Sequence, residues 1–181
     1  MTAVFLVVAC SDRPRSLSPS NARQVVIDLG RQRAWLMEGQ KTLLDTPITT
    51  GRDGYRTPLG SFVIMRKERV YESTVYGSYV SDTSGRVVLS GVDRRKHYNL
   101  KGVRFKGAQM NYYMEFALGI GMHAGDLTPY PSSHGCVRLP VVAARTFFEL
   151  LDIGCNVRVQ NSGPALPTTA AQSVTQPARA N

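Results

Sequence analysis

Residues 123–140 read HAGDLTPYPSSHGCVRLP, and this stretch governs the interpretation of the whole chain. It places Cys136 two residues after His134 and a short loop after His123. A cysteine attacks carbonyl carbon as the thiolate, and a free cysteine with a pKa of about 8.5 is mostly protonated at neutral pH. It therefore needs a base or a cation beside it, which either histidine can supply. The stretch predicts a cysteine nucleophile.

Two other interpretations of Cys136 compete with this one. An isolated cysteine is more often a small buried hydrophobe than a nucleophile, but the polar, turn-rich segment 128–133 and Gly135 favour the rim of a loop. Two histidines and two cysteines, counting Cys155, also offer four ligands for zinc. The chain has no C-x2-C pair, no H-x3-H pair and no HExxH helix. The spacing favours the nucleophile.

The same stretch resembles the signature of the L,D-transpeptidase catalytic domain (YkuD-like), a family that crosslinks bacterial peptidoglycan. The similarity rests on residues 123–125 and 130–140, and upstream on residues 24–37, 49–51 and 56–64. It extends over roughly residues 23 to 160. The resemblance implies a β-sandwich or barrel, and the cysteine motif in this combination is highly specific.

The resemblance implies roles for several residues of the site. Cys136 is the expected nucleophile and His123 the expected general base and acid, its other ring nitrogen bound by the backbone carbonyl of Ala124 or Gly125. Acyl transfer creates an oxyanion, for which the backbone N–H of Gly135, with that of Cys136, is best placed. The implied chemistry needs no metal or cofactor.

A second set of residues is expected to support the site or to bind substrate. In an extended segment His134 projects to the same side as the sulfur of Cys136. Ser133 either hydrogen-bonds in the site or holds the turn, and Arg138 either lowers the thiolate pKa, holds a carboxylate or makes a structural ion pair. Tyr113 and Met114 resemble cavity-lining residues, although alternation along a strand makes one of them core.

Apolar and β-branched runs between Gly, Pro and Asn turns predict a mainly β fold. The expected strands are Gln24–Leu29, Ala34–Glu38, Lys41–Ile48, Ser61–Arg66, Val87–Leu89, Met110–Phe116 and Asn156–Gln160. One packed helix is expected after the cysteine, from about Pro140 to Leu151, with Val141, Ala144, Phe148 and Leu151 on one face.

The 181 residues divide into three parts. Residues 1–22 resemble a lipoprotein signal and tether in which Cys10 is lipidated, residues 23–160 form the catalytic domain, and residues 161–181 are too poor in large apolar side chains to be ordered. We expect an exported envelope protein, periplasmic and anchored to the membrane through Cys10. The net charge of +9 is scattered and accompanies no nucleic-acid motif, so we expect no nucleic-acid partner.

The resemblance implies a cysteine-dependent acyltransferase acting on peptidoglycan stem peptides. It would release D-alanine from a tetrapeptide stem and pass the acyl group through a thioester to an amine acceptor. Two alternatives remain: a hydrolase or D-amino-acid exchange enzyme on the same site, and a wall-binding module without activity. The presence of both Cys136 and His123 disfavours the binding module.

Overall fold

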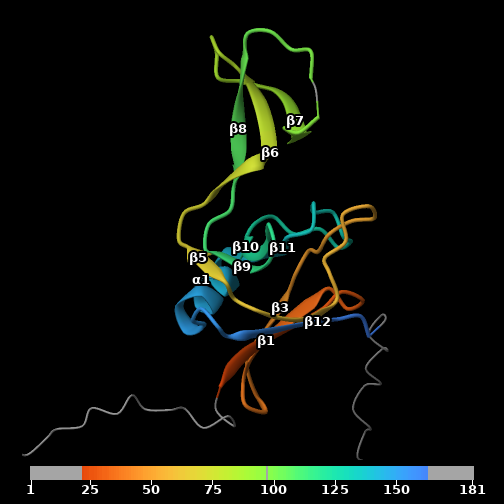
Figure 1. The fold of residues 1–181 in the computed structure, drawn as a ribbon, viewed down its shortest axis with the longest axis vertical. Helices are drawn as coiled ribbons and strands as arrows, with labels where there is room; N and C mark the ends of the chain where they lie inside the picture. Colours follow the sequence, from red (N-terminus) through yellow and green to blue (C-terminus); the bar gives the residue numbers. More distant parts are fainter. Residues whose placement is uncertain (1–21, 97, 163–181) are drawn as a thin grey trace, which may run out of the picture.

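The computed structural model describes residues 22–96 and 98–162 (Figure 1). This part of the chain is mainly β, with a single α-helix. The strands are β1 (Arg23–Asp28), β2 (Arg33–Glu38), β3 (Lys41–Pro47), β4 (Gly60–Val63), β5 (Arg66–Glu68), β6 (Glu72–Ser81), β7 (Val87–Asp93), β8 (Val103–Gln109), β9 (Tyr113–Ala117), β10 (Ile120–Ala124), β11 (Val137–Leu139) and β12 (Asn156–Gln160). The helix is α1 (Val141–Leu150). It is too short and not apolar enough to cross a bilayer.

The strands form three sheets. The first has the order β3-β2-β1-β12-β4, in which β1 and β12 pair in parallel and so join the two ends of the described chain. The second has the order β11-β10-β9-β5, and the third is the antiparallel sheet β7-β6-β8. The third sheet extends away from the body formed by the other two and α1 (Figure 1).

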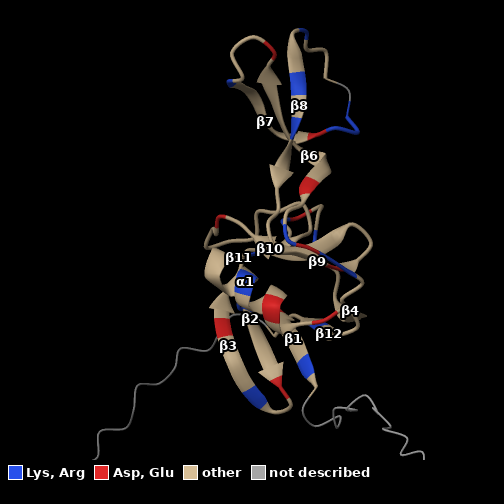
Figure 2. Cartoon of the chain, turned by 90° about the vertical axis from the view of Figure 1, so that its left-hand side faces the viewer, with Lys and Arg blue, Asp and Glu red and all other residues tan. Residues whose placement is uncertain are grey.

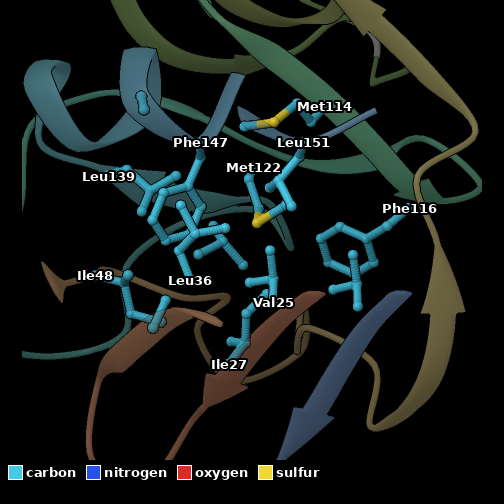
Figure 3. Packing of buried hydrophobic residues seen from close by; sticks show 14 of the residues in the cluster. Val25, Ile27, Leu36, Ile48, Met114, Phe116, Met122, Leu139, Phe147 and Leu151 are labelled. Carbon is cyan, nitrogen blue, oxygen red and sulfur yellow. The ribbon is translucent and has the colours of Figure 1, made fainter. Parts of the chain in front are cut away.

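The core lies between the first two sheets and is closed by α1 (Figure 3). Val25 and Leu36 face it from the first sheet, Met122 from the second and Phe147 from the helix, and all four are completely buried. Burying a side chain of this size stabilises the fold by about 1.5–3 kcal/mol. This core fixes the second sheet, whose opposite face carries the site.

The helix follows the catalytic stretch as the sequence predicts, but its buried face differs from the expected one. Ala144, Phe147 and Leu151 are buried, whereas Val141, assigned to that face, is 61% exposed. The assignment of Val141 to the buried face is therefore wrong. Pro140 is the N-cap, and Val141 lies in the first turn of the helix, on the side that faces solvent. Lys67 Nζ donates to the carbonyl of Phe148 at 2.7 Å. A positive charge at the C-terminal end of a helix interacts favourably with the helix dipole and stabilises α1.

The strand expected over Met110–Phe116 begins later than predicted. Tyr112 has a φ of 57°, in the left-handed region that a non-glycine residue rarely adopts, and the chain turns there before β9 starts at Tyr113. In β9, Met114 faces the core and is 0% exposed. The assignment of Met114 to a substrate wall is therefore wrong.

The third sheet carries basic residues on β8 and in the segment that follows β7. Lys and Arg recur along β8, where Arg104 and Lys106 are exposed (Figure 2). After β7, Arg95 forms an ion pair with the buried carboxylate of Asp93 at 2.8 Å and donates to the hydroxyl of Tyr76 at 2.7 Å. The basic segment after β7, residues 94–96, thus contacts β6 through Arg95.

Candidate active site

The pairing of β10 with β11 brings the catalytic stretch together. The two strands are parallel, with Met122 opposite Val137 and His123 opposite Arg138. Met122 and Val137 are fully buried in the core, so the alternating residues His123 and Arg138 face the other side of the sheet. By the same alternation Cys136, just before β11, faces that side too. His123, Cys136 and Arg138 therefore share one face.

Cys136 is half-buried, and its sulfur lies against the β9–β10 turn, with a weak hydrogen bond from Sγ to the carbonyl of Gly119 at 3.9 Å. Neither histidine forms a hydrogen bond with Sγ in the described structure. Burial raises the pKa of the Cys136 thiol above its usual value, while a hydrogen bond from the Gly121 backbone and the charge of Arg138 lower that pKa. The thiol is therefore protonated at neutral pH and needs a base to react.

His123 is 7% exposed, and its Nδ1 lies 2.8 Å from the carbonyl oxygen of Ala124. A carbonyl only accepts hydrogen bonds, so Nδ1 carries the proton and Nε2 is left with a free lone pair. Burial lowers the pKa of His123 to about 4, against the hydrogen bond with Ala124, and Arg138 lowers this pKa further. Near pH 7 the site thus holds a neutral thiol and a neutral imidazole that is ready to accept a proton.

Ser133 holds the turn before Cys136. Its hydroxyl is buried, donates to the carbonyl of Cys136 at 2.5 Å and accepts from the N–H of Gly135 at 3.0 Å. The N–H of Gly135 is thus engaged by Ser133 in this conformation, so the oxyanion role expected of it stays a prediction that requires this bond to open. The N–H of Cys136 has no hydrogen-bond partner in the described residues.

Gly135 has a structural role instead. Its φ of 116° lies where L side chains are rarely found, and a Cβ there would lie 3.4 Å from Ile120. Its carbonyl accepts a hydrogen bond from Thr57 Oγ1 at 2.7 Å, and the same oxygen of Thr57 accepts from the N–H of Gly51 at 3.0 Å. A Cβ on Gly51 would lie 2.0 Å from the carbonyl of Tyr55, so only glycine fits.

Residues of the upstream motif therefore hold the turn at Cys136 in place. Thr49 exchanges both backbone hydrogen bonds with Arg138, at 3.0 and 2.8 Å, and the N–H of Arg52 donates to the carbonyl of Ser133 at 3.1 Å. Segments about 80 residues apart in sequence are thus joined at the site. We call residues 49–57 the clamp loop.

His134 does not follow the geometry expected of an extended segment, because residues 134–135 form a bend and β11 begins only at Val137. Its ring stacks on Tyr76 of β6, with centroids 4.3 Å apart, and meets Tyr55 edge-on at 4.8 Å. Nη2 of Arg52 lies 2.7 Å from its Nε2. A guanidinium only donates, so Nε2 accepts and His134 is neutral, with the proton on Nδ1.

Burial lowers the pKa of His134, and the charges of Arg52 and Arg138 lower it further. Arg52, Tyr55 and Tyr76 were not predicted from the sequence. Arg52 follows the Thr49–Gly51 motif directly, a signal that was available, whereas nothing local marks Tyr76.

The side chain of Arg138 packs against Gly125, where an added Cβ would lie 3.2 Å from its carbons. Its Nη1 lies 3.5 Å from Ser132 Oγ. It forms no ion pair in the part of the chain that the structure describes. The alternative of a structural ion pair therefore has no support there.

Tyr113 lies on the site face of β9. The ring of Tyr113 packs against Gly121, where an added Cβ would lie 2.7 Å from the ring. The ring of Tyr71 stacks on the ring of Tyr113, with centroids 4.5 Å apart. Burial raises the pKa of Tyr113, and the proximity of Cys136 raises it further. A protonated hydroxyl therefore lies near the sulfur.

The cysteines of the chain do not form a common site with the histidines in the described structure. Cys136 and Cys155 are both free thiols, and Cys155 Sγ accepts a hydrogen bond from the Asp152 N–H at 3.3 Å beside the core. His123 and His134 contact Ala124 and Arg52, respectively, and do not converge on Cys155. Cys10 lies outside the described residues.

Fold and site together define a mainly β protein with a cysteine and a histidine on one face of a sheet. A model of the L,D-transpeptidase catalytic domain (YkuD) matches residues 22–159. The chain therefore belongs to the L,D-transpeptidase catalytic domain family, and the resemblance found in its sequence is confirmed. This family acts on peptidoglycan stem peptides.

Solved structures share the fold. An L,D-transpeptidase from Stackebrandtia nassauensis is 24% identical with a TM-score of 0.57, and the match covers 85% of this chain and 63% of that one. L,D-transpeptidase 1 from Mycobacterium tuberculosis is 19% identical with a TM-score of 0.54, covering 77% and 62%. A complex of LdtMt1 with imipenem is 18% identical with a TM-score of 0.57, covering 76% and 58%.

The chain thus spans less than two thirds of the length of these relatives. At these identities the likeness concerns the fold. Comparison with curated proteins gives no match.

Proposed function

We propose that this protein is a peptidoglycan L,D-transpeptidase that works by cysteine acyl transfer. The observation that carries the proposal is the hydrogen bond of His123 Nδ1 to Ala124 at 2.8 Å, which leaves Nε2 as a proton acceptor on the face that also carries Cys136. A neutral, oriented imidazole beside a protonated thiol is what a nucleophilic cysteine requires.

In the first half-reaction, Cys136 Sγ attacks the carbonyl carbon between the third and fourth residues of a tetrapeptide stem. The thiol proton passes to His123 Nε2, and the carbonyl oxygen becomes an oxyanion that the N–H of Cys136 stabilises. When the intermediate collapses, the peptide bond breaks and His123 gives its proton to the leaving amine. D-alanine departs and a thioester remains on Cys136.

In the second half-reaction, an amine of a neighbouring stem attacks the thioester carbon. His123 Nε2 takes the proton of the amine, a new amide forms, and the carbon–sulfur bond breaks. The proton then returns from His123 to the sulfur. Water in place of the amine gives hydrolysis of the same thioester, so the acceptor alone separates the transpeptidase from a carboxypeptidase.

Two further side chains support the chemistry. Ser133 fixes both the carbonyl of Cys136 and the N–H of Gly135, which belong to the peptide planes on either side of the one that carries the N–H of Cys136. The buried hydroxyl of Tyr113, protonated at neutral pH, offers a donor to the substrate beside the sulfur.

We also propose export to the cell envelope with a lipid anchor at Cys10. The apolar run 3–9 followed by Cys10 supports this proposal, since it resembles a lipoprotein cleavage box. Labelling cells with a fatty acid analogue tests it: the full chain should take up the label, and Cys10→Ser should not.

The enzymatic proposal is tested with a purified disaccharide tetrapeptide. We expect D-alanine release and crosslinked dimers with the wild type, and neither product with Cys136→Ala. D-alanine release without dimers would instead identify a hydrolase. Absence of both products with a folded wild-type protein would contradict the proposal.

A further inference from the structure

Arginine side chains that are half-buried in this protein fall into two groups. Four arginines of the described chain are half-buried, and two of them, Arg23 and Arg33, form ion pairs with carboxylates on neighbouring strands. The other two, Arg52 and Arg138, form no ion pair within residues 22–96 and 98–162. A partly desolvated charge without a counterion is costly, so a pair of them at one place indicates a site for an anion.

Both unpaired arginines lie beside the nucleophile turn, on either side of Ser132. Arg52 Nη1 is 3.4 Å from the carbonyl oxygens of Ser132 and Ser133, and Arg138 Nη1 is 3.5 Å from Ser132 Oγ. These distances lie at the outer limit of a hydrogen bond. Each guanidinium carries five N–H donors. The one short contact of the pair is that of Arg52 Nη2 with His134 Nε2 at 2.7 Å, so most of the donors are not met within the described residues.

The charges of Arg52 and Arg138 influence the same residues near Cys136. Arg52 contacts His134 at 2.7 Å, and Arg138 lies opposite His123 in the β10–β11 register. Both arginines lower the pKa of His134. The guanidinium groups therefore border one region next to Cys136, on the side where the clamp loop meets the turn.

A carboxylate is the ligand that fits this region. Planar guanidinium groups bind carboxylates through paired N–H donors, and such charge-assisted bonds are about twice as strong as neutral ones. In the donor stem of the proposed reaction, the residue that leaves carries the free terminal carboxylate. One residue spans about 3.8 Å, so this carboxylate lies close to the carbonyl under attack.

We propose that Arg52 and Arg138 form the binding site for the terminal carboxylate of the donor stem and so restrict the enzyme to stems that end one residue after the scissile bond. This inference rests on the proposed function and adds the residues that determine donor specificity. It assigns to Arg138 one of the roles considered from its sequence position, and to Arg52 a role that no sequence pattern suggested.

The test uses two donors that differ only at the terminus: a tetrapeptide stem ending in D-alanine and the same stem ending in D-alaninamide. The kcat/KM for release of the terminal residue is measured for each. We expect the wild type to prefer the free carboxylate by about tenfold to a hundredfold, the effect of hydrogen bonds to a charged group. Arg52→Gln and Arg138→Gln should each reduce this preference.

The matched control is Arg56→Gln. Arg56 lies in the same clamp loop, but it is exposed and paired with Asp53 at 2.7 Å, so the donor preference should stay at the wild-type value. The preference is a ratio, so a loss of structure that slows both donors equally leaves it unchanged.

A wild type that releases both terminal residues equally well, or variants at Arg52 and Arg138 that keep the full preference, would overturn this inference. If a folded wild type releases neither terminal residue, the proposed function itself is contradicted, and this outcome is distinct from a loss of donor preference.

Discussion

The ring of Tyr76 stacks on the ring of His134, with centroids 4.3 Å apart and planes 22° from parallel. The contact joins the third sheet to the turn that carries Cys136. A bulge of β6 makes it possible: β6 advances five residues from Glu72 to Gly77 while β8 advances two, from Gln109 to Gly107. Such a bulge redirects a side chain out of the regular ladder.

Replacing Tyr76 should therefore slow the reaction at Cys136. We expect Tyr76→Ala to lower kcat/KM by roughly two- to tenfold, the contribution of one aromatic pair, and Tyr76→Phe to retain most of the rate because the ring remains. The control is Tyr79→Ala, which removes a ring that packs on Tyr98 and Phe105 within the sheet. Equal losses in Tyr76→Ala and Tyr79→Ala would show that only sheet stability matters.

Thr57 is expected to hold the clamp loop on the turn. Thr57→Val keeps the shape but leaves the N–H of Gly51 and the carbonyl of Gly135 without their partner, at a cost of about 1–3 kcal/mol in the free energy of unfolding. Urea unfolding measures this change. Thr46→Val is the control, because that buried hydroxyl bonds only the adjacent Pro47 carbonyl. A loss no larger than the control's would contradict the clamp.

His123 should make the protein less stable in acid. Its pKa is about 4 in the folded protein and about 6.5 when unfolded, so between these values the unfolded chain binds more protons. Stability therefore rises with pH across this window, by up to about 1.4 kcal/mol per unit from this one group, and is lost as pH falls toward 4. His123→Gln should flatten the dependence in urea titrations, and parallel curves for the two proteins would contradict the shift.

Cys136 should react as a thiol of raised pKa. We expect its alkylation by iodoacetamide, followed at this residue by peptide mapping, to keep rising with pH above about 8.5. Arg138→Gln should move the curve to higher pH, because the charge of Arg138 lowers the Cys136 pKa. The exposed Arg158→Gln serves as the control, and an unchanged curve for Arg138→Gln would exclude this electrostatic role.

Much of the body of the fold was predictable. The strands that became β1, β2, β3 and β12 carry apolar and β-branched residues that pack on one core, and the segment after Cys136 has helical periodicity. The sequence did not reveal β6 or β8. That sheet extends from the body, and its strands contain Gly77 and Gly107 and lack a continuous apolar face.

The site was predictable where it is local in sequence. Cys136, His123, His134 and Ser133 belong to one short stretch, so their association follows from the motif. Arg52 and Tyr76 reach this stretch through tertiary contacts across about 80 and 60 residues. The position of Arg52 directly after the Thr49–Gly51 motif was a signal for it, whereas no local pattern marks Tyr76. The hydrogen bond that engages the Gly135 N–H depends on the rotamer of Ser133, and it too lies beyond sequence reasoning.

The central claim is that Cys136 forms a covalent acyl intermediate with His123 as its base. Intact mass after incubation with the tetrapeptide disaccharide and, separately, with imipenem tests it most directly. We predict that imipenem leaves an adduct of its own mass on the wild type, that His123→Gln forms it more slowly, and that Cys136→Ala forms none. An adduct on Cys136→Ala, or a folded wild type with no adduct from either compound, would contradict the account.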